Sequence, residues 1–97
     1  MTNSAVLLKE MKELLHSYSS GNLPLNGLTQ RLETLSDALP NPSHEWRIRF
    51  FGLWLGLEEV NALLLDEKKR KPNLEEQHVL DDRLNKLNSL IDSELAQ

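Results

Sequence analysis

Cysteine is absent from this chain of 97 residues. Disulfide bonds, thiol nucleophiles and thiolate metal sites are therefore excluded, and packing alone has to stabilise the fold. A chain without disulfides suits the reducing environment inside cells, so we expect a cytoplasmic protein.

Long apolar runs are also missing. The longest, residues 50–57, is far shorter than the roughly 20 residues that a helix needs to cross a bilayer. The N-terminal sequence MTNSAVLLKEMKELL has no basic segment ahead of an apolar one, because lysines and glutamates interrupt its apolar residues. We therefore expect neither a membrane span nor a signal peptide.

Known catalytic motifs are absent as well. The sequence has no phosphate-binding glycine loop, nucleophile elbow or dinucleotide fingerprint. Its histidines, His16, His44 and His78, fall in different segments, and none has a second histidine at helical spacing with which to bind a metal. Asp81 and Asp82 are adjacent, so on a helix they point in different directions and make a poor acid/base pair. We expect no enzymatic activity, no metal site and no cofactor.

The residues that are present favour a small helical domain. Apolar residues make up 39% and charged residues 27% of the chain, close to the average of soluble globular proteins. Leucine, a good helix former, dominates the apolar set. Because domains usually contain about 50 to 250 residues, we expect residues 1–97 to form a single domain.

Apolar residues recur at the spacing of one helical face in four segments. This pattern predicts helices at about residues 4–19, 25–39, 44–69 and 74–95. Short loops between four helices predict an all-α fold, a bundle of about four helices. The faces expected to form the core are Val6, Leu7, Met11, Leu14, Leu15 and Tyr18; Leu25, Leu28, Leu32, Leu35 and Leu39; and Leu80, Leu84, Leu87, Ile91 and Leu95.

Local signals support these boundaries. Gly21 tolerates the positive φ that ends many helices, and the prolines of residues 40–42 stop the second helix. Ser43 can cap the third helix. Asn73, followed three residues later by Glu76, resembles a capping box at the start of the fourth helix.

The third helix differs from the others because it is apolar on two sides. A helix of this kind is usually covered on two sides, so we expect it to be central and mostly buried. Gly52 and Gly56 within it either let a neighbouring element approach closely or lie on the solvent side. Its first face contains Trp46, Phe50, Leu53, Leu57, Val60 and Leu64, and its second contains Phe51, Leu55, Ala62 and Leu65.

The charge is −4 overall, and the last segment, residues 72–97, contains six acidic and two basic residues. An acidic surface attracts basic partners and repels nucleic acid. The run Lys68 to Lys71 either complements the C-terminal dipole of the third helix or anchors an acidic partner or a nucleic acid. The carboxylates either form a solvated face or bind a protein partner; the candidates are Glu58, Glu59, Glu75, Glu76, Asp81, Asp82 and Asp92.

Three segments carry a resemblance to a known family. They are LLHSYSSGNLPLNGLTQRLETL (14–35), WLGLEEVNALLLDE (54–67) and the leucine-striped acidic helix that follows. Together they resemble the small all-helical immunity proteins of bacteria, which neutralise a cognate toxin in contact-dependent growth inhibition and some bacteriocin systems. The resemblance implies a cytoplasmic protein that binds a basic nuclease toxin domain and blocks its active-site groove or an adjacent exosite.

A second interpretation stays open. The same pattern fits a helical interaction module, such as a secretion chaperone, an adaptor or a self-associating regulator. Such a module is expected to leave a large apolar patch near Trp46 or Trp54 for association. When free, the protein is expected to be a monomer or a homodimer.

Overall fold

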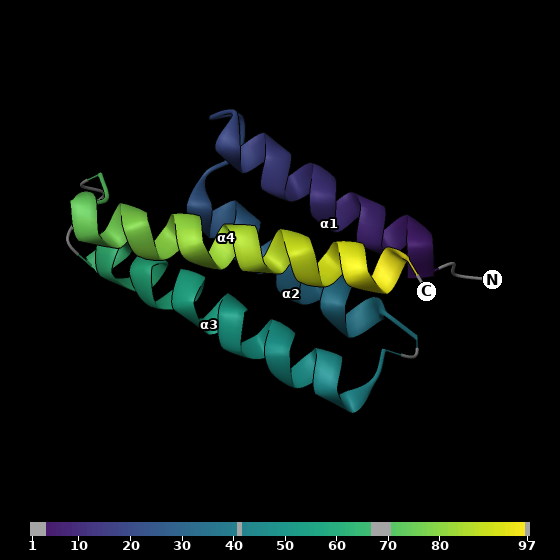
Figure 1. Cartoon of the computed structure of the whole chain (residues 1–97). Coiled ribbons are helices and arrows are strands. Elements are labelled where there is room, and N and C mark those ends of the chain that lie inside the picture. The colour runs from purple at the N-terminus through teal and green to yellow at the C-terminus, as the bar shows by residue number, and fades with distance from the viewer. Residues whose placement is uncertain (1–3, 41, 67–70, 97) are drawn as a thin grey trace.

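Four α-helices make up the fold in the computed structural model, which describes residues 4–40, 42–66 and 71–96. They are α1 (Ser4–Ser19), α2 (Leu25–Ala38), α3 (His44–Asp66) and α4 (Leu74–Leu95) (Figure 1). These described residues contain no strand. The predicted all-α bundle is confirmed, with helix boundaries close to those predicted. The predicted extension of α3 to residue 69 lies outside the described residues.

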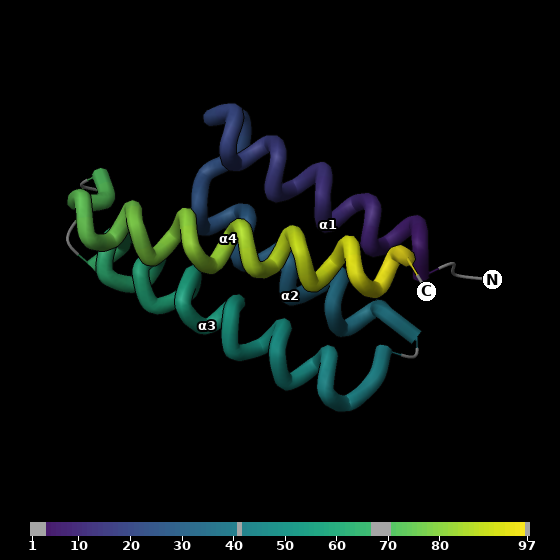
Figure 2. The backbone as a smooth tube through the Cα atoms, in the orientation of Figure 1, coloured from purple at the N-terminus to yellow at the C-terminus, as the bar shows by residue number. Residues whose placement is uncertain are grey.

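The helices form a ring in which each packs against two others. α1 packs on α2 and α4, and α3 packs on α2 and α4, whereas the backbones of the diagonal pairs do not approach closely. Successive helices run in alternating directions, so the start of α1 and the end of α4 lie at the same end of the bundle (Figure 2). The result is an elongated body of 41 × 24 × 19 Å.

The turn after α1 forms as the sequence predicts. Gly21 has a φ of 81°, a left-handed conformation that glycine adopts without steric cost. The amide of Asn22 donates to the carbonyl of Ser17 at 2.9 Å, and the amide of Gly21 donates to that of Tyr18 at 3.0 Å. These bonds satisfy carbonyl groups that the end of the helix leaves without partners.

Both predicted caps are also present. The amide of Trp46 donates to Ser43 Oγ at 3.1 Å, which caps the start of α3. At the start of α4, the amide of Glu76 donates to Asn73 Oδ1 at 2.8 Å, and the amide of Asn73 donates to Glu76 Oε1 at 2.9 Å. This reciprocal pair is a complete capping box.

The core occupies the interior of the ring and receives leucines from all four helices. The α2 face, the first α3 face and the α4 face contribute as predicted, either buried or packed against the core. The α1 face is shifted by comparison with the prediction, because Leu8 is 2% exposed while Val6 is 52% exposed. The fully buried leucines and isoleucine are Leu8, Leu28, Leu32, Leu57, Leu80, Leu87 and Ile91.

The expectation of a central, mostly buried α3 is wrong for one of its two apolar faces. Trp46, Phe50 and Leu57 are buried as predicted, but the second face, which includes Phe51 and Leu55, is exposed. A helix in a four-membered ring has neighbours on its inner side and flanks only. The outer side of α3 therefore faces solvent even though it is apolar.

Polar side chains tie α3 to its neighbours. Trp54 Nε1 donates to the carbonyl of Thr29 in α2 at 2.8 Å, and Trp46 Nε1 donates to the carbonyl of Leu90 in α4 at 3.3 Å. Asn61, which is buried, donates to Asn26 Oδ1 at 3.0 Å. Buried polar groups are costly unless they are paired, so these bonds favour one rotational setting of α3.

Candidate functional site

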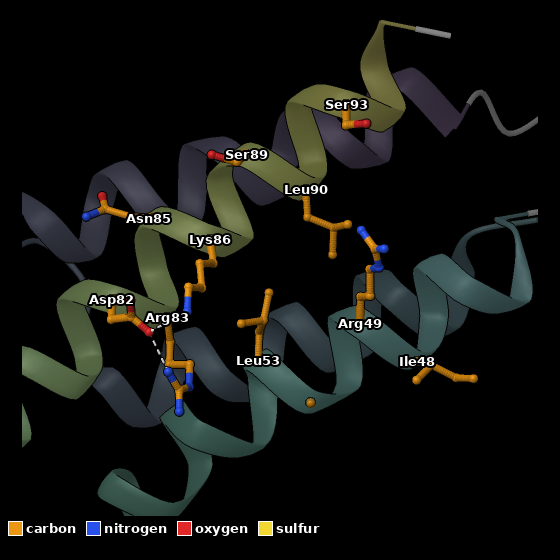
Figure 3. Close-up of a pocket in the computed structure, with 11 residues that line it drawn as sticks. Ile48, Arg49, Leu53, Asp82, Arg83, Asn85, Lys86, Ser89, Leu90 and Ser93 are labelled. Atoms are coloured by element: carbon orange, nitrogen blue, oxygen red, sulfur yellow. Dashed lines mark hydrogen bonds and ion pairs between the residues drawn. The ribbon is translucent and has the colours of Figure 1, made fainter.

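A groove between α3 and α4 has a volume of about 920 Å³. We refer to it as the α3/α4 groove. Leu53 from α3 and Leu90 from α4 point toward one another across it (Figure 3). The residues that line it are Ile48, Arg49, Gly52, Leu53, Asp82, Arg83, Asn85, Lys86, Ser89, Leu90 and Ser93.

Two glycines of α3 shape the groove in different ways. A Cβ atom on Gly56 would lie 2.8 Å from Arg83 Nε and 3.0 Å from Arg83 Cγ, so the glycine leaves room for this side chain to lie against α3. A Cβ atom on Gly52 would meet nothing within 4 Å. Both alternatives expected for the glycines therefore occur, close approach at Gly56 and the solvent side at Gly52.

The charges in the groove are mostly positive. Arg49, Arg83 and Lys86 line it against a single carboxylate, Asp82. Arg83 forms an ion pair with Asp82, and Lys86 Nζ lies 3.2 Å from the same carboxylate. Arg49 pairs with Glu45 at 2.8 Å one turn back along α3. The two cations of α4 thus share one anion.

The electrostatics of Asp82 follow from this arrangement. The hydrogen bond from Lys86 lowers the pKa of Asp82 below its ordinary value of 3.8, with further lowering from the charge of Lys86 and from Arg83. Charge-assisted hydrogen bonds favour the ionised carboxylate in this way. Asp82 is therefore held as an anion at neutral pH.

An apolar stripe follows the outer side of α3 beside the groove. We call Ile48, Phe51 and Leu55 the α3 stripe; they are 60%, 55% and 37% exposed. They recur at the three-and-four spacing of one helical face. The ring of Phe51 stacks on that of Trp54, with centroids 5.8 Å apart and planes 23° apart, so the stripe contains a supported aromatic surface.

Carboxylates border the α3 stripe on two sides. Glu58 and Glu59 follow it along α3. On the α2 side, a smaller hollow of about 210 Å³ is lined by Phe51, Glu33 and Asp37, among others. The stripe is therefore an apolar strip with acidic groups at one end and along one edge.

The predicted acidic residues of α4 do not share one surface. Asp92 forms an ion pair with Lys12 of α1, and Asp81 raises the pKa of Tyr18 of α1, after the larger effect of burial. Asp82 instead lines the groove on the side of α3. These three aspartates thus point to opposite flanks of α4.

The remaining predicted site residues also differ in their surroundings. Glu76 is occupied by the capping box. Glu75, in the first turn of α4, and Glu59 are exposed, and Glu58 is half-buried. Glu58 and Glu59 lie beside the α3 stripe, so the structure brings them next to the exposed apolar residues of α3. A partner-binding role for all seven residues stays a prediction.

No group of three or more His, Cys, Asp or Glu side chains is placed to hold a metal within residues 4–40, 42–66 and 71–96. No helix in these ranges is both long enough and apolar enough to cross a bilayer. Residues 68–70 of the basic run lie outside the described residues.

The sequence pattern identified Phe51 and Leu55 as apolar but placed them in the interior, and it did not identify the groove. One signal was available for the stripe. In a ring with only three other helices among the described residues, both faces of a long apolar helix cannot be covered. The groove has no comparable signal, since it depends on how α3 and α4 pack and on the contact between Gly56 and Arg83.

Comparisons with protein-family models, with curated proteins and with solved structures give no match for this chain.

Proposed function

We propose that this chain is an immunity protein that binds and neutralises a secreted nuclease toxin in the cytoplasm, with no catalytic activity of its own. The proposal starts from the resemblance of residues 14–35 and 54–67 to small helical immunity proteins. The net charge of −4 agrees with it, because an acidic inhibitor is attracted to the basic substrate groove of a nuclease.

The exposed α3 stripe is the observation that carries the proposal. Binding surfaces typically combine a desolvated apolar or aromatic centre with a polar rim. Ile48 and Phe51 are both more than half exposed, although a side chain of this size normally gains about 1.5 to 3 kcal/mol from burial. Docking of a partner on α3 supplies that burial.

The acidic border fits the same partner. Glu58 and Glu59 continue the line of the stripe, and Glu33 and Asp37 flank Phe51 from α2. Carboxylates in these positions can occupy phosphate subsites of a nuclease while Phe51 and Leu55 bury apolar area. Charges at a rim mainly accelerate association, whereas a central aromatic slows dissociation.

The test is co-expression with the C-terminal domain of whatever large secreted protein is encoded just upstream, scored by growth and by co-purification. Rescue of growth together with a one-to-one complex is the expected result. Phe51→Ala is expected to weaken the complex by at least about 30-fold, as for an aromatic hot spot of about 2 kcal/mol. Val6→Ala is the matched control, because Val6 is an apolar residue that is 52% exposed, about as much as Phe51 at 55%, but lies on α1.

Charge reversal tests the border of the stripe. Glu58→Lys with Glu59→Lys is expected to slow association and to reduce its dependence on salt. A toxic domain that the wild-type chain neither binds nor neutralises would overturn the proposal. A complex weakened by Val6→Ala but not by Phe51→Ala would move the binding surface away from α3.

The same stripe supports a second candidate function, a self-associating interaction module. Apolar residues on one outer helix face can form a two-fold contact with a second copy. Sedimentation equilibrium separates the candidates. A stable dimer that Phe51→Ala dissociates, without toxin neutralisation, would favour the module, whereas a monomer that binds toxin would favour immunity.

A further inference from the structure

The α3/α4 groove has a charge opposite to that of the molecule around it. Its lining contains three cationic side chains and one carboxylate, a balance of +2, in a chain whose net charge is −4. Arg83 and Lys86 share Asp82, and Arg49 pairs with Glu45, which lies outside the lining, so these ion pairs leave one positive charge uncompensated. The groove therefore offers cationic groups to a ligand.

Gly52 keeps the α3 wall of the groove open. A glycine inside a helix costs about 1 kcal/mol relative to alanine, and nothing within 4 Å would meet a Cβ atom at Gly52. Packing inside the domain therefore does not require a glycine at this position. Because Gly52 lines the groove, a side chain here would instead occupy the groove itself.

Gly56 has a complementary role at the end where α3 and α4 approach. The side chain of Arg83 lies so close to the Gly56 backbone that a Cβ atom would be 2.8 Å from Nε. This contact holds Arg83 against α3, and its guanidinium stays beside the carboxylate of Asp82 (Figure 3). A positively charged donor is thus fixed in the groove and loses little conformational entropy when it binds an anion.

The rest of the lining suits a peptide. Leu53 and Leu90 provide half-buried apolar surface, and Ile48 at the rim is 60% exposed. Ser89 and Ser93 of α4 add hydroxyl groups that can donate to carbonyl or carboxylate oxygens. Apolar surface beside fixed donors is the usual composition of a specific binding groove.

We propose that the α3/α4 groove binds an acidic segment of a protein partner that carries apolar side chains on one face. Carboxylates of the segment pair with Arg49, Arg83 and Lys86, and an apolar side chain packs on Leu53 and Leu90. The proposal goes beyond the immunity function, which uses the α3 stripe and its acidic border, and does not depend on it.

Nucleic acid fits the groove less well. Single-stranded binding sites combine basic residues with aromatic side chains on which bases stack, and no aromatic residue lines this groove. The net charge of −4 also opposes a backbone that carries one negative charge per nucleotide.

The test uses two synthetic helical peptides as probes. One has leucines at the three-and-four spacing of one face with glutamates beside them, and the other replaces each glutamate by glutamine. Fluorescence anisotropy is expected to show at least tenfold tighter binding of the glutamate peptide. In ¹⁵N-labelled protein, its binding is expected to shift the amide signals of Gly52, Ser89 and Leu90, but not those of Arg31 on α2.

Gly52→Leu is the decisive variant. Its Cβ atom meets nothing within 4 Å, the rest of the leucine side chain is expected to fill the groove, and leucine is a better helix former than glycine. We expect at least tenfold weaker peptide binding with an unchanged or higher urea midpoint, a combination that misfolding cannot produce. Ala62→Leu on the exposed outer side of α3 is the size control and is expected to bind as the wild type does.

Charge variants complete the test. Lys86→Glu is expected to weaken binding of the glutamate peptide at least tenfold, and Arg31→Glu is expected to leave it unchanged. Absence of binding at millimolar peptide, or binding that survives Gly52→Leu, would overturn the proposal. If the protein bound oligouridine RNA and Gly52→Leu weakened that binding equally, the groove would be assigned to nucleic acid. If the protein formed a homodimer that Gly52→Leu dissociates, the groove would be assigned to a second copy. Either result would overturn the proposal.

Discussion

Leu55 and Leu57 of α3 are only two positions apart but have opposite surroundings. Leu57 is 0% exposed and Leu55 is 37% exposed. We expect Leu57→Asp to unfold the domain, because a buried, unpaired charge costs about 4 kcal/mol or more, which is most of the stability of a small domain. Leu55→Asp, the same change on the outer side, is expected to leave the helix content intact. Far-UV circular dichroism checks both variants, and equal loss of helicity would contradict this division of α3.

Asp82 predicts a dependence of stability on pH. Its pKa is lowered from 3.8 in the folded state, chiefly by the hydrogen bond from Lys86. The stabilisation of the fold by ionised Asp82 is therefore fully present above pH 3.8, and it is lost as the pH falls through the lower pKa that Asp82 has in the folded state. Asp82→Asn is expected to lower the urea midpoint at neutral pH, and this difference is expected to shrink in acid. In a variant that also carries Arg83→Gln and Lys86→Gln, the effect of Asp82→Asn on the urea midpoint is expected to be small at every pH. In the wild-type background, an effect of Asp82→Asn that does not change with pH would contradict the assignment.

At the scale of single elements, the capping box of α4 gives a matched pair of substitutions. Asn73 accepts from the amide of Glu76 at 2.8 Å, so Asn73→Ala is expected to lower the free energy of unfolding by about 1 kcal/mol. Asn88→Ala makes the same change at an exposed position inside α4 and is expected to be neutral or stabilising, since alanine has the higher helix propensity. Urea denaturation of both variants checks the prediction, and equal losses would show that the cap contributes nothing.

The helices were predictable because their signals are local. The caps at Ser43 and Asn73 and the turn at Gly21 involve residues within five positions of one another. The leucine spacing of α2 and α4 likewise identifies their buried faces without knowledge of the neighbouring helices. Where one face is clearly apolar and the other clearly polar, the sequence specifies which side is inside.

The candidate site was predictable only in part, because it depends on contacts between helices. Both faces of α3 are apolar, so its pattern alone cannot show that Phe51 faces outward; the ring of helices decides this. The separation of Asp81 from Asp82 onto opposite flanks of α4 follows from helix geometry. Their partners in α1 and in the groove depend on tertiary packing. The role of Gly56 requires knowing that Arg83 lies against it.

At the scale of the whole molecule, the two proposed surfaces meet at α3. The α3 stripe with its acidic border lies on the outer side of this helix, and the cationic α3/α4 groove lies along one flank. Ile48 belongs to both surfaces. A partner large enough to cover α3 would therefore meet negative charge on one side and positive charge on the other, which restricts its orientation.

The closed ring of helices leads to a prediction about chain connectivity. α1 packs on α4, and the start of α1 lies at the same end of the bundle as the end of α4 (Figure 1). A flexible linker from the end of α4 to the start of α1, with the chain opened between Asn41 and Pro42, should therefore preserve every helix. We expect this circular permutant to unfold cooperatively, as small single domains usually do. A permutant opened between Gly52 and Leu53 interrupts the backbone hydrogen bonds in the middle of α3 and is expected to lose several kcal/mol. Urea denaturation distinguishes them, and equal stability of the two permutants would show that an intact α3 is not what holds the ring together.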